Sequence, residues 1–554
     1  MHKSQQQKEY PMQQSTPASD QHTGQNPDQK HNQSFYGHPR PLKGLFLTEI
    51  WERFSYYGIR PLLILYMSAI VAEGGLGLER ASAAALVGLF SGSIYLMTIF
   101  GGWIADNWLG QAKSVWYGSI IIAMGHLSIA MSAIFGNFFF YFGLVLIVLG
   151  TGLFKTCIAV IVGTLYSDTD GRRDAGFSIF YMGINIGAFC APLVTGLLIE
   201  HYAWHIGFGI GGIGMLISLI TFRLYAVPQL QDFNRSQLAT TTPLSSDSDT
   251  NRQQPNPEPI SAPSYDHPVV KHPHAGKIVL GFLLILAVVI GLVSIGIIKI
   301  NTVLMATYLM MVIILSLVLY FLYFMLSKAF TRVEKYKILL CFILIFAAAL
   351  YWSAFEQQPT SYNLFARDYT DRMLFGLQIP TVWFQSINPI FIVIFAPLLG
   401  WLWVKLDRVN KNPSHIIKFA LALLFAALGF LVMALASQAV VSGQGALVSP
   451  LWLVSSLFLL TLGELLLSPI GLSAMTLLSP SAIRGQIMGL WCTAMALGNV
   501  IAGLIGGHMI SDAIENLPRL FFQCIFVLCA GAIVLFILNP VMKKLLKQPQ
   551  SNSV

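Results

Sequence analysis

Apolar residues fall in fourteen long runs along the chain, separated by short polar connections. A membrane-spanning helix needs about 20 consecutive, mostly apolar residues, and each run meets that length. The expected spans are 44–72, 82–104, 114–134, 138–165, 175–200, 204–226, 276–298, 302–327, 336–357, 379–405, 415–438, 449–478, 485–510 and 517–542. The pattern therefore predicts an all-α integral membrane protein with fourteen transmembrane helices.

Two longer segments are polar and rich in Ser, Pro, Asn and Gln, which is typical of flexible chain. One precedes the first span, and the other follows the sixth; the eight remaining spans begin with a pair that holds almost no polar residues, which leaves a final group of six. The expected units are a disordered cytoplasmic tail (1–40), a six-helix bundle (41–226), a flexible cytoplasmic loop (227–274), a two-helix insertion (275–328), a second six-helix bundle (329–545) and a C-terminal tail (546–554). Two such halves around an insert favour a pseudo-symmetric carrier with its site between the halves.

The distribution of Lys and Arg predicts the orientation. With an even number of spans, both termini lie on one side. The short connections on that side hold eleven basic residues: Lys113, Arg172, Arg173, Lys328, Arg332, Lys335, Lys337, Lys405, Arg408, Lys411 and Arg484. The other side holds five: Arg80, Lys299, Arg367, Arg372 and Arg519. Because basic residues concentrate in cytoplasmic loops, both termini are expected in the cytoplasm.

Composition agrees with a membrane protein and excludes other classes. Hydrophobic residues make up 55% of the chain and charged residues 10%, whereas soluble domains carry about 25% charged residues. The net charge of +8 is explained by topology, so we expect a lipid bilayer and no nucleic acid as partner. The cysteines lie in apolar stretches without metal-ligand spacing. With no clustered nucleophile or metal set, the sequence predicts neither an enzyme nor a cofactor.

The first span carries charged residues on one face. A charge in hydrocarbon costs at least about 2.5–3.5 kcal/mol, so each is a functional candidate. At 100° per residue, one stripe of this helix is polar and the opposite side is apolar. The stripe consists of Glu49, Glu52, Arg53, Tyr56, Tyr57 and Arg60. The pattern favours a helix that faces a wet cavity, and the alternative is a set of ion pairs that only hold the bundle together.

Three later charges, Lys155, Glu356 and Glu464, fall deep inside spans. Buried ions need partners. The cations Arg60 and Lys155 lie in the first half of the chain and the anions in the second, so we expect ion pairs between the halves. Such pairs could break and reform as the halves rock, and a carboxylate without its partner binds a proton more readily. Other polar residues at similar depth are Tyr95, Asn185, Gln385, Asn388, Ser468 and Trp491, each of which also fits a simple interhelical contact.

Residues 49–60, which read EIWERFSYYGIR, resemble the first-helix signature of the proton-dependent oligopeptide transporter family. Residues 180–187 (FYMGINIG), 384–389 (FQSINP) and 463–469 (GELLLSP) are also similar to family motifs, so the resemblance spans about 41–545. It implies a major-facilitator fold, symport driven by the proton gradient, di- and tripeptide substrates, and monomeric function. The central helix pair resembles the prokaryotic branch, which implies the bacterial inner membrane.

The resemblance also implies residue roles. Proton coupling would fall to Glu49, Glu52, Arg53, Lys155, Glu356 and Glu464. The gating pairs would be Arg60 with Glu356 and Lys155 with Glu464. The peptide carboxylate would bind Arg53, Arg60 and Lys155, and the amine Glu464, Asn185 and Asn388. Side-chain pockets would include Tyr56, Tyr57, Tyr95 and Trp491, and Ser468 would also belong to the substrate-binding site.

One motif departs from the family pattern. Thr156 and Cys157 follow Lys155 where the family usually has Pro-Asn, so the helix kink and a backbone-binding amide are lost. This departure keeps open a carrier of the same fold for another small zwitterion, such as an amino acid or a modified peptide, or for nitrate. A transport-derived sensor that binds partners through its polar segments is a further alternative.

Overall fold

The computed structural model describes residues 35–167, 170–241, 272–374, 376–480, 483–509 and 514–546. The predictions of a disordered tail at 1–40, a flexible loop at 227–274 and a C-terminal tail at 546–554 therefore fall largely outside the described residues.

Fourteen long helices account for the fourteen predicted spans. They are α2 (Pro41–Ser68), α3 (Arg80–Ile104), α4 (Gln111–Phe135), α5 (Asn137–Thr164), α6 (Arg173–His201), α7 (Trp204–Thr221), α9 (Ala275–Ser294), α10 (Thr302–Leu326), α11 (Arg332–Phe355), α13 (Ile387–Arg408), α14 (His415–Ser442), α15 (Leu451–Leu478), α16 (Arg484–Met509) and α17 (Leu517–Leu546). Thirteen helical segments of the described chain are long and apolar enough to cross a membrane. The exception is α2, because of its charged stripe. The prediction of an all-α membrane protein with fourteen spans is confirmed.

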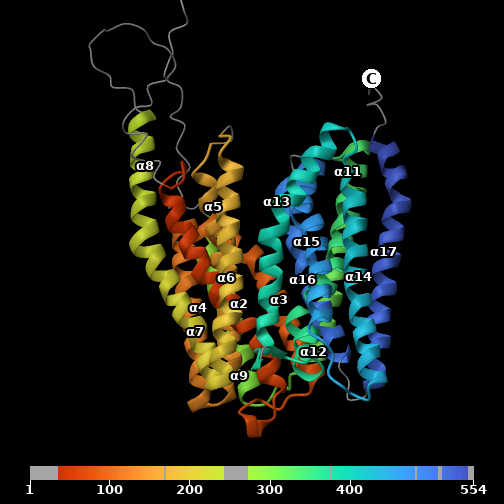
Figure 1. Ribbon diagram of the computed structural model, residues 1–554. Coiled ribbons are helices and arrows are strands. Elements are labelled where there is room, and N and C mark those ends of the chain that lie inside the picture. Colours follow the sequence, from red (N-terminus) through yellow and green to blue (C-terminus); the bar gives the residue numbers. More distant parts are fainter. Residues whose placement is uncertain are drawn as a thin grey trace, which may run out of the picture.

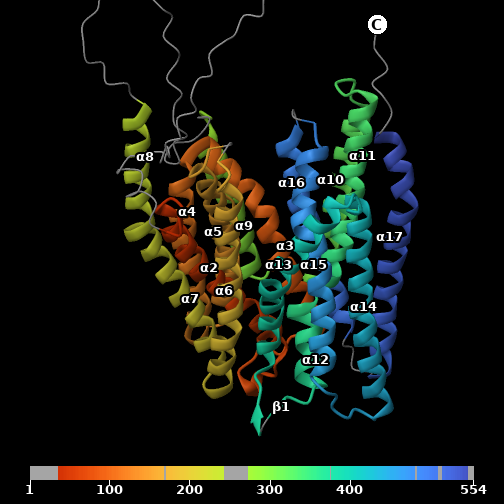
Figure 2. The ribbon, with the colours of Figure 1, turned by 45° about the horizontal axis from the view of Figure 1, so that its top comes forward.

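Short elements connect or extend these helices. They are η1 (Val71–Glu73), η2 (Ala105–Leu109), η3 (Phe222–Ala226), α8 (Val227–Thr241), η4 (Gln358–Tyr362), α12 (Asn363–Asp368), β1 (Met373–Leu374), β2 (Leu377–Gln378), η5 (Thr381–Ser386) and η7 (Ile514–Asn516). The two strands form an antiparallel hairpin in which Leu374 pairs with Leu377. This hairpin lies at the end of the molecule opposite the C-terminus (Figure 2).

The helices form two bundles that stand side by side (Figure 1). The first contains α2 to α7, and the second contains α11 and α13 to α17. They touch where α3 packs against α16. At this crossing Gly88 and Gly503 allow a close backbone approach, since a Cβ atom added to Gly88 would lie 2.8 Å from the Cα of Gly503. The bundles are thus separate units joined at specific contacts.

The two inserted helices lie at the periphery. Most side chains of α9 are exposed, and α9 contacts the first bundle through the ring of Phe282, which lies 4.9 Å from that of Phe100. Helix α10 places Ala306 in a small cluster with Ala85 and Val500, where α3 and α16 meet. The exposed faces of both helices are almost entirely apolar, as lipid-facing surfaces require.

Residues 227–241 differ from the prediction, because they form helix α8 where the sequence predicts the start of a flexible loop. This helix continues α7 through the π-helical turn η3. Its side chains Val227, Leu230 and Phe233 pack on the hydrophobic core, and Leu230 is fully buried. Apolar residues at a spacing of three outweigh the polar composition of the segment, which becomes Ser- and Thr-rich only further along.

Residues 35–40 also differ from the predicted disordered tail. His38 is buried, and its Nδ1 atom shares a hydrogen bond of 2.9 Å with the Tyr166 hydroxyl. Arg172 donates to the carbonyl of Gly37 and pairs with Asp170 at 2.8 Å. Hydrogen bonds from Arg172 lower the pKa of Asp170 to about 2, so this ion pair persists at any physiological pH. These contacts attach the segment to the connection between α5 and α6.

Gly101 provides a test of helix packing in the first bundle. A Cβ atom on Gly101 would lie 2.1 Å from the carbonyl oxygen of Gly152 on α5, whereas one on Gly102 would lie 3.5 Å from Thr156. We expect Gly101→Ala to destabilise the protein by about 1–3 kcal/mol, since α3 and α5 must separate. The midpoint of thermal unfolding in detergent measures this. Gly102→Ala is the matched control, and equal midpoints for the two variants would contradict the packing.

Candidate functional site

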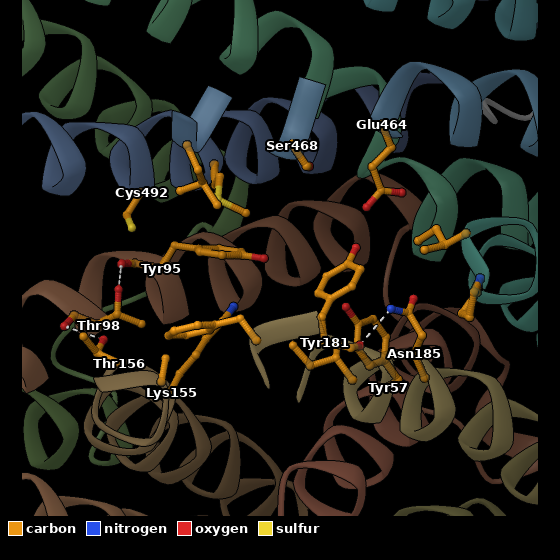
Figure 3. A pocket seen from close by; sticks show the side chains of 18 of the residues that line it. Tyr57, Tyr95, Thr98, Lys155, Thr156, Tyr181, Asn185, Glu464, Ser468 and Cys492 are labelled. Atoms are coloured by element: carbon orange, nitrogen blue, oxygen red, sulfur yellow. Dashed lines mark hydrogen bonds between the residues drawn. The ribbon is translucent and has the colours of Figure 1, made fainter. Parts of the chain in front are cut away.

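A cavity of about 1210 Å³ lies between the two bundles. Its lining includes Tyr57, Arg60, Tyr95, Lys155, Asn185, Trp352, Glu356, Gln385, Asn388, Glu464, Ser468 and Trp491. At one end it reaches Tyr166 and Arg173, which lie at the connection assigned to the cytoplasm by the distribution of basic residues. Figure 3 shows Lys155 and Glu464 on opposite walls. The stripe on α2 thus does border a cavity, through Tyr57 and Arg60.

The extracellular end is closed by contacts between the bundles. Asn363 donates to the carbonyl of Pro61 at 2.7 Å, and the indole of Trp383 donates to the carbonyl of Leu193 at 3.1 Å. Two ion pairs reinforce this closure, Arg372 with Glu200 at 3.2 Å and Arg80 with Asp368 at 3.1 Å. Because these contacts join the bundles on one side while the cavity reaches the cytoplasmic ends, the conformation is inward-facing.

Glu49, Glu52 and Arg53 form a buried ionic cluster on α2. The Nε atom of Arg53 lies 3.1 Å from Glu49 and also donates to Glu52. None of the three is among the described residues that line the cavity. Two carboxylates face one guanidinium, so the group carries a net charge of −1 when both acids are ionised. Burial makes this charge costly, and one added proton would neutralise it.

Arg60 links the two bundles. It pairs with Glu356 and donates to Asn499 at 3.2 Å, and both partners belong to the second half of the chain. The expected pair of Arg60 with Glu356 is therefore formed in this conformation. Tyr56 does not line the cavity, because it lies buried between Arg53 and Arg60. Its ring centroid is 5.7 Å from one guanidinium and 5.8 Å from the other.

The expected pair of Lys155 with Glu464 is not formed. Lys155 places its ammonium 4.0 Å from the ring centroid of Tyr95 and has no carboxylate within 4.0 Å among the described residues. Glu464 instead accepts a hydrogen bond of 2.9 Å from Asn388. In the inward-facing conformation the walls that carry these two charges stand apart across the cavity. An open cationic site therefore faces an open anionic site.

The other predicted residues are placed as follows. Asn185 lines the cavity, but its amide donates to the carbonyl of Tyr181 on the same helix at 3.0 Å. Ser468 and Trp491 line the wall formed by the second bundle, and the Trp491 ring packs against Phe419. Arg53 is the one predicted carboxylate ligand that the structure keeps away from the cavity. Its guanidinium pairs with Glu49 and Glu52 instead.

Sequence reasoning missed several lining residues, namely Thr98, Tyr181, Trp352, Phe355, Gln358 and Cys492. The hydroxyl of Tyr181 points toward Glu464 in Figure 3. Its position one helical turn before Asn185 could have identified it, since residues four apart share a helix face. Asn499, which holds Arg60, could have been found as an uncharged polar residue inside an apolar helix.

The two residues that depart from the family motif have different surroundings. Thr156 lines the cavity, and its hydroxyl donates to the carbonyl of Thr98 on α3 at 3.2 Å. Cys157 is fully buried and outside the cavity lining as described. The hydroxyl thus links α5 to α3 beside Lys155, while the thiol is buried in the bundle interior next to Ser114 of α4.

Comparison with known proteins agrees with this geometry. A sequence profile described as the POT family matches residues 112–517. The chain is 53% identical to the peptide transporter YePEPT of Yersinia enterocolitica, covering 91% of this chain and 95% of that protein. It is 33% identical to a di-/tripeptide transporter of Lactococcus lactis subsp. cremoris, covering 93% and 98%.

A solved structure has the same architecture. The crystal structure of a peptide transporter POT in complex with sulfate superposes with a TM-score of 0.80 at 35% identity, covering 93% of this chain and 98% of that chain. The predicted major-facilitator arrangement and the resemblance noted in the sequence are thereby confirmed. The chain belongs to the POT family of proton-dependent oligopeptide transporters.

Proposed function

We propose that this protein imports di- and tripeptides together with protons by alternating access. The observation that carries the proposal is the pair of opposite charges, Lys155 and Glu464, which line facing walls of one cavity. A zwitterionic peptide has a carboxylate at one end and an ammonium at the other, so it matches both walls at once. The relatives whose names specify peptides support this substrate class.

The bound peptide takes a definite orientation in this proposal. Its carboxylate binds Lys155, with Arg60 nearby, and its amine binds Glu464 and Asn388. Tyr57, Tyr95, Asn185, Ser468 and Trp491 form pockets for the side chains, as all of them line the cavity. Charge-assisted hydrogen bonds at both ends fix the orientation, while the large volume tolerates different side chains.

Proton coupling is assigned to two groups of ionic residues. In the first, the excess carboxylate of the cluster formed by Glu49, Glu52 and Arg53 takes up a proton when the site faces outward. In the second, Glu356 and Arg60 join the bundles when the site faces inward. Protonation of Glu356 would release Arg60 and allow the extracellular side to open. Each state of the carrier thus depends on where the proton lies.

Uptake measurements test this function. Purified protein in liposomes should accumulate labelled dipeptides above the external concentration when the interior is alkaline. Collapse of the proton gradient should reduce transport to equilibration. Uptake that is insensitive to the gradient would refute coupling, and absence of dipeptide uptake with active transport of another zwitterion would refute the substrate class.

Glu356→Gln should shift the carrier toward outward-facing states. Neutral Gln holds Arg60 less well, and a hydrogen bond to a charged group contributes about 1.5–3 kcal/mol, which corresponds to a population change of about tenfold or more. Spin labels at Val71 and Leu447, exposed at the extracellular end, should report a longer distance between the bundles. Glu79→Gln, at an exposed carboxylate of the same side, is the control. Identical distances in both variants would contradict the gating role.

Another small zwitterion is the second candidate substrate. It is favoured by Thr156, which presents a hydroxyl already bonded to Thr98 where the family usually has a Pro followed by an amide side chain. The protein would then bind the two charged ends of the substrate but make fewer hydrogen bonds to the substrate's backbone. A thermal-shift screen of dipeptides against amino acids and modified peptides separates these substrates.

A further inference from the structure

The described chain begins with a tight turn just before α2. The backbone N–H of His38 donates to the carbonyl of Phe35 at 2.9 Å. The two residues between them, Tyr36 and Gly37, have positive φ values of 50° and 79°. Two successive residues with positive φ define a type I′ turn, and glycine adopts this conformation without strain. The turn therefore fixes the position from which the His38 side chain extends.

The His38 side chain packs against the connection between α5 and α6. Only 7% of its surface is exposed, and its Nδ1 atom shares a hydrogen bond of 2.9 Å with the Tyr166 hydroxyl. The centroids of the two rings lie 5.9 Å apart in an edge-to-face arrangement. At the far end of the connection, Arg172 donates to the carbonyl of Gly37 at 3.1 Å. The turn thus contacts both ends of this connection.

These contacts lie at the mouth of the transport cavity. Tyr166 and Arg173 line the cytoplasmic end of the cavity. The Tyr166 ring also packs closely on the first turn of α6, since a Cβ atom added to Gly176 would lie 2.1 Å from the Tyr166 hydroxyl oxygen. The turn is followed directly by α2, which begins at Pro41. His38 therefore joins the start of α2 to the ends of α5 and α6 that border the cavity.

The groups around His38 favour its neutral form. Burial and the positive charge of Arg172 lower the pKa of His38, while the carboxylate of Asp170 raises it by less. This carboxylate is already paired with Arg172 at 2.8 Å. Tyr166 keeps its proton, because burial raises the pKa of its hydroxyl to about 12. Tyr166, Asp170 and Arg172 are the titratable or charged groups of the α5–α6 connection that face His38.

The contact of His38 with Tyr166 should weaken in acid. A histidine that leaves the protein interior regains its ordinary pKa of about 6.5. Because the pKa of the buried side chain is lower than that of the released one, the released state takes up a proton first as the pH falls. The stabilisation of the turn by His38 is therefore complete above about pH 6.5 and is lost progressively below it.

We propose that His38 and Tyr166 form a latch that holds the start of α2 against the α5–α6 connection at neutral cytoplasmic pH and opens when the cytoplasm acidifies. With the latch closed, the cytoplasmic ends of α2, α5 and α6 move as one body when the cavity mouth closes against the second bundle. An open latch uncouples these ends, so the carrier returns more slowly to the outward-facing state. Because proton symport acidifies the cytoplasm, the latch limits transport by feedback, and this consequence alone rests on the proposed function.

Hydrogen–deuterium exchange of the full-length protein in detergent tests the latch without a transport assay. The backbone amide of His38 is protected by its hydrogen bond to Phe35, and its exchange rate is corrected for the intrinsic effect of pH. We expect the corrected rate to rise by up to about tenfold between pH 7.5 and pH 5.5. An equal corrected rate at the two pH values would overturn the proposal.

Variants assign this effect to the latch. His38→Gln keeps an amide that can bond to Tyr166 but does not titrate, so exchange should no longer depend on pH. Tyr166→Phe lacks the hydroxyl and should exchange rapidly at both pH values, and it replaces His38→Gln if that variant does not fold. His201→Gln, at an exposed histidine at the end of α6, is the matched control and should behave as the wild type. The pH dependence of the wild type in either latch variant would refute the latch.

Peptide exchange tests the feedback separately. Labelled peptide is exchanged for unlabelled peptide across liposomes that have the same pH on both sides. The rate of the wild type relative to that of His38→Gln should fall by about twofold or more between pH 7.5 and pH 5.5. A constant ratio, in a protein whose deuterium exchange shows the latch to open, would refute the feedback. Absence of peptide exchange in both proteins would count against the proposed function, because the deuterium measurement does not depend on transport.

Discussion

Glu52→Gln is expected to abolish peptide accumulation while leaving exchange of labelled for unlabelled peptide measurable. Glu52 is almost fully buried and shares Arg53 with Glu49. With Gln at this position, one carboxylate balances one guanidinium, and the cluster no longer gains from binding a proton. The substrate contacts proposed for Lys155 and Glu464 are unchanged, so binding and exchange should persist.

Transport into liposomes with an alkaline interior measures this outcome. Internal peptide should rise only to the external concentration in the variant, while the wild-type protein exceeds it. Glu73→Gln removes an exposed extracellular carboxylate and serves as the matched control. Full accumulation by Glu52→Gln, with normal folding, would show that the α2 cluster does not carry the coupled proton.

Lys155→Gln is expected to weaken dipeptide binding by about 10- to 100-fold. Hydrogen bonds to charged groups contribute about 1.5–3 kcal/mol, and each 1.4 kcal/mol is a factor of ten in affinity. The ammonium of Lys155 lies over the Tyr95 ring and has no carboxylate within 4.0 Å among the described residues, although it interacts at longer range with Glu49 and Glu52. Lys155 therefore breaks no direct salt bridge with a described residue when it binds the peptide carboxylate.

Calorimetric titration of the detergent-purified protein with dialanine measures the affinity. Lys155→Arg should retain part of the binding because the positive charge remains, although the longer and planar group fits less well. Lys113→Gln, at an exposed lysine of α4, controls for the loss of one positive charge. Wild-type affinity in Lys155→Gln would exclude this residue as the carboxylate ligand.

Much of the fold could be predicted from the sequence, because the bilayer imposes a simple rule on it. Each span needs a fixed length of apolar residues, so the predicted ranges and the observed helices differ mostly at their ends. The errors occur where the membrane no longer constrains the chain. Helix α8 continues α7 beyond the last apolar run, and residues 35–40 are held by His38 and Arg172.

The candidate site could be predicted in part for an energetic reason. Charged side chains are so costly in hydrocarbon that Arg60, Lys155, Glu356 and Glu464 could be singled out one by one. Uncharged lining residues such as Tyr181 carry no such signal, because an aromatic residue in an apolar helix is usually packed in a core.

The sequence by itself determined the membrane-spanning class, the two-halved organisation and the short list of intramembrane charges, and it predicted the orientation. Each of these depends on the free energy of placing a residue in hydrocarbon or in water, which is a property of that residue and its near neighbours. Only the tertiary structure decided which charges meet. Arg60 reaches Glu356 while Lys155 and Glu464 stand apart, because partners are selected by the relative position of two bundles. That position depends on contacts between residues hundreds of positions apart, such as Asn363 with Pro61.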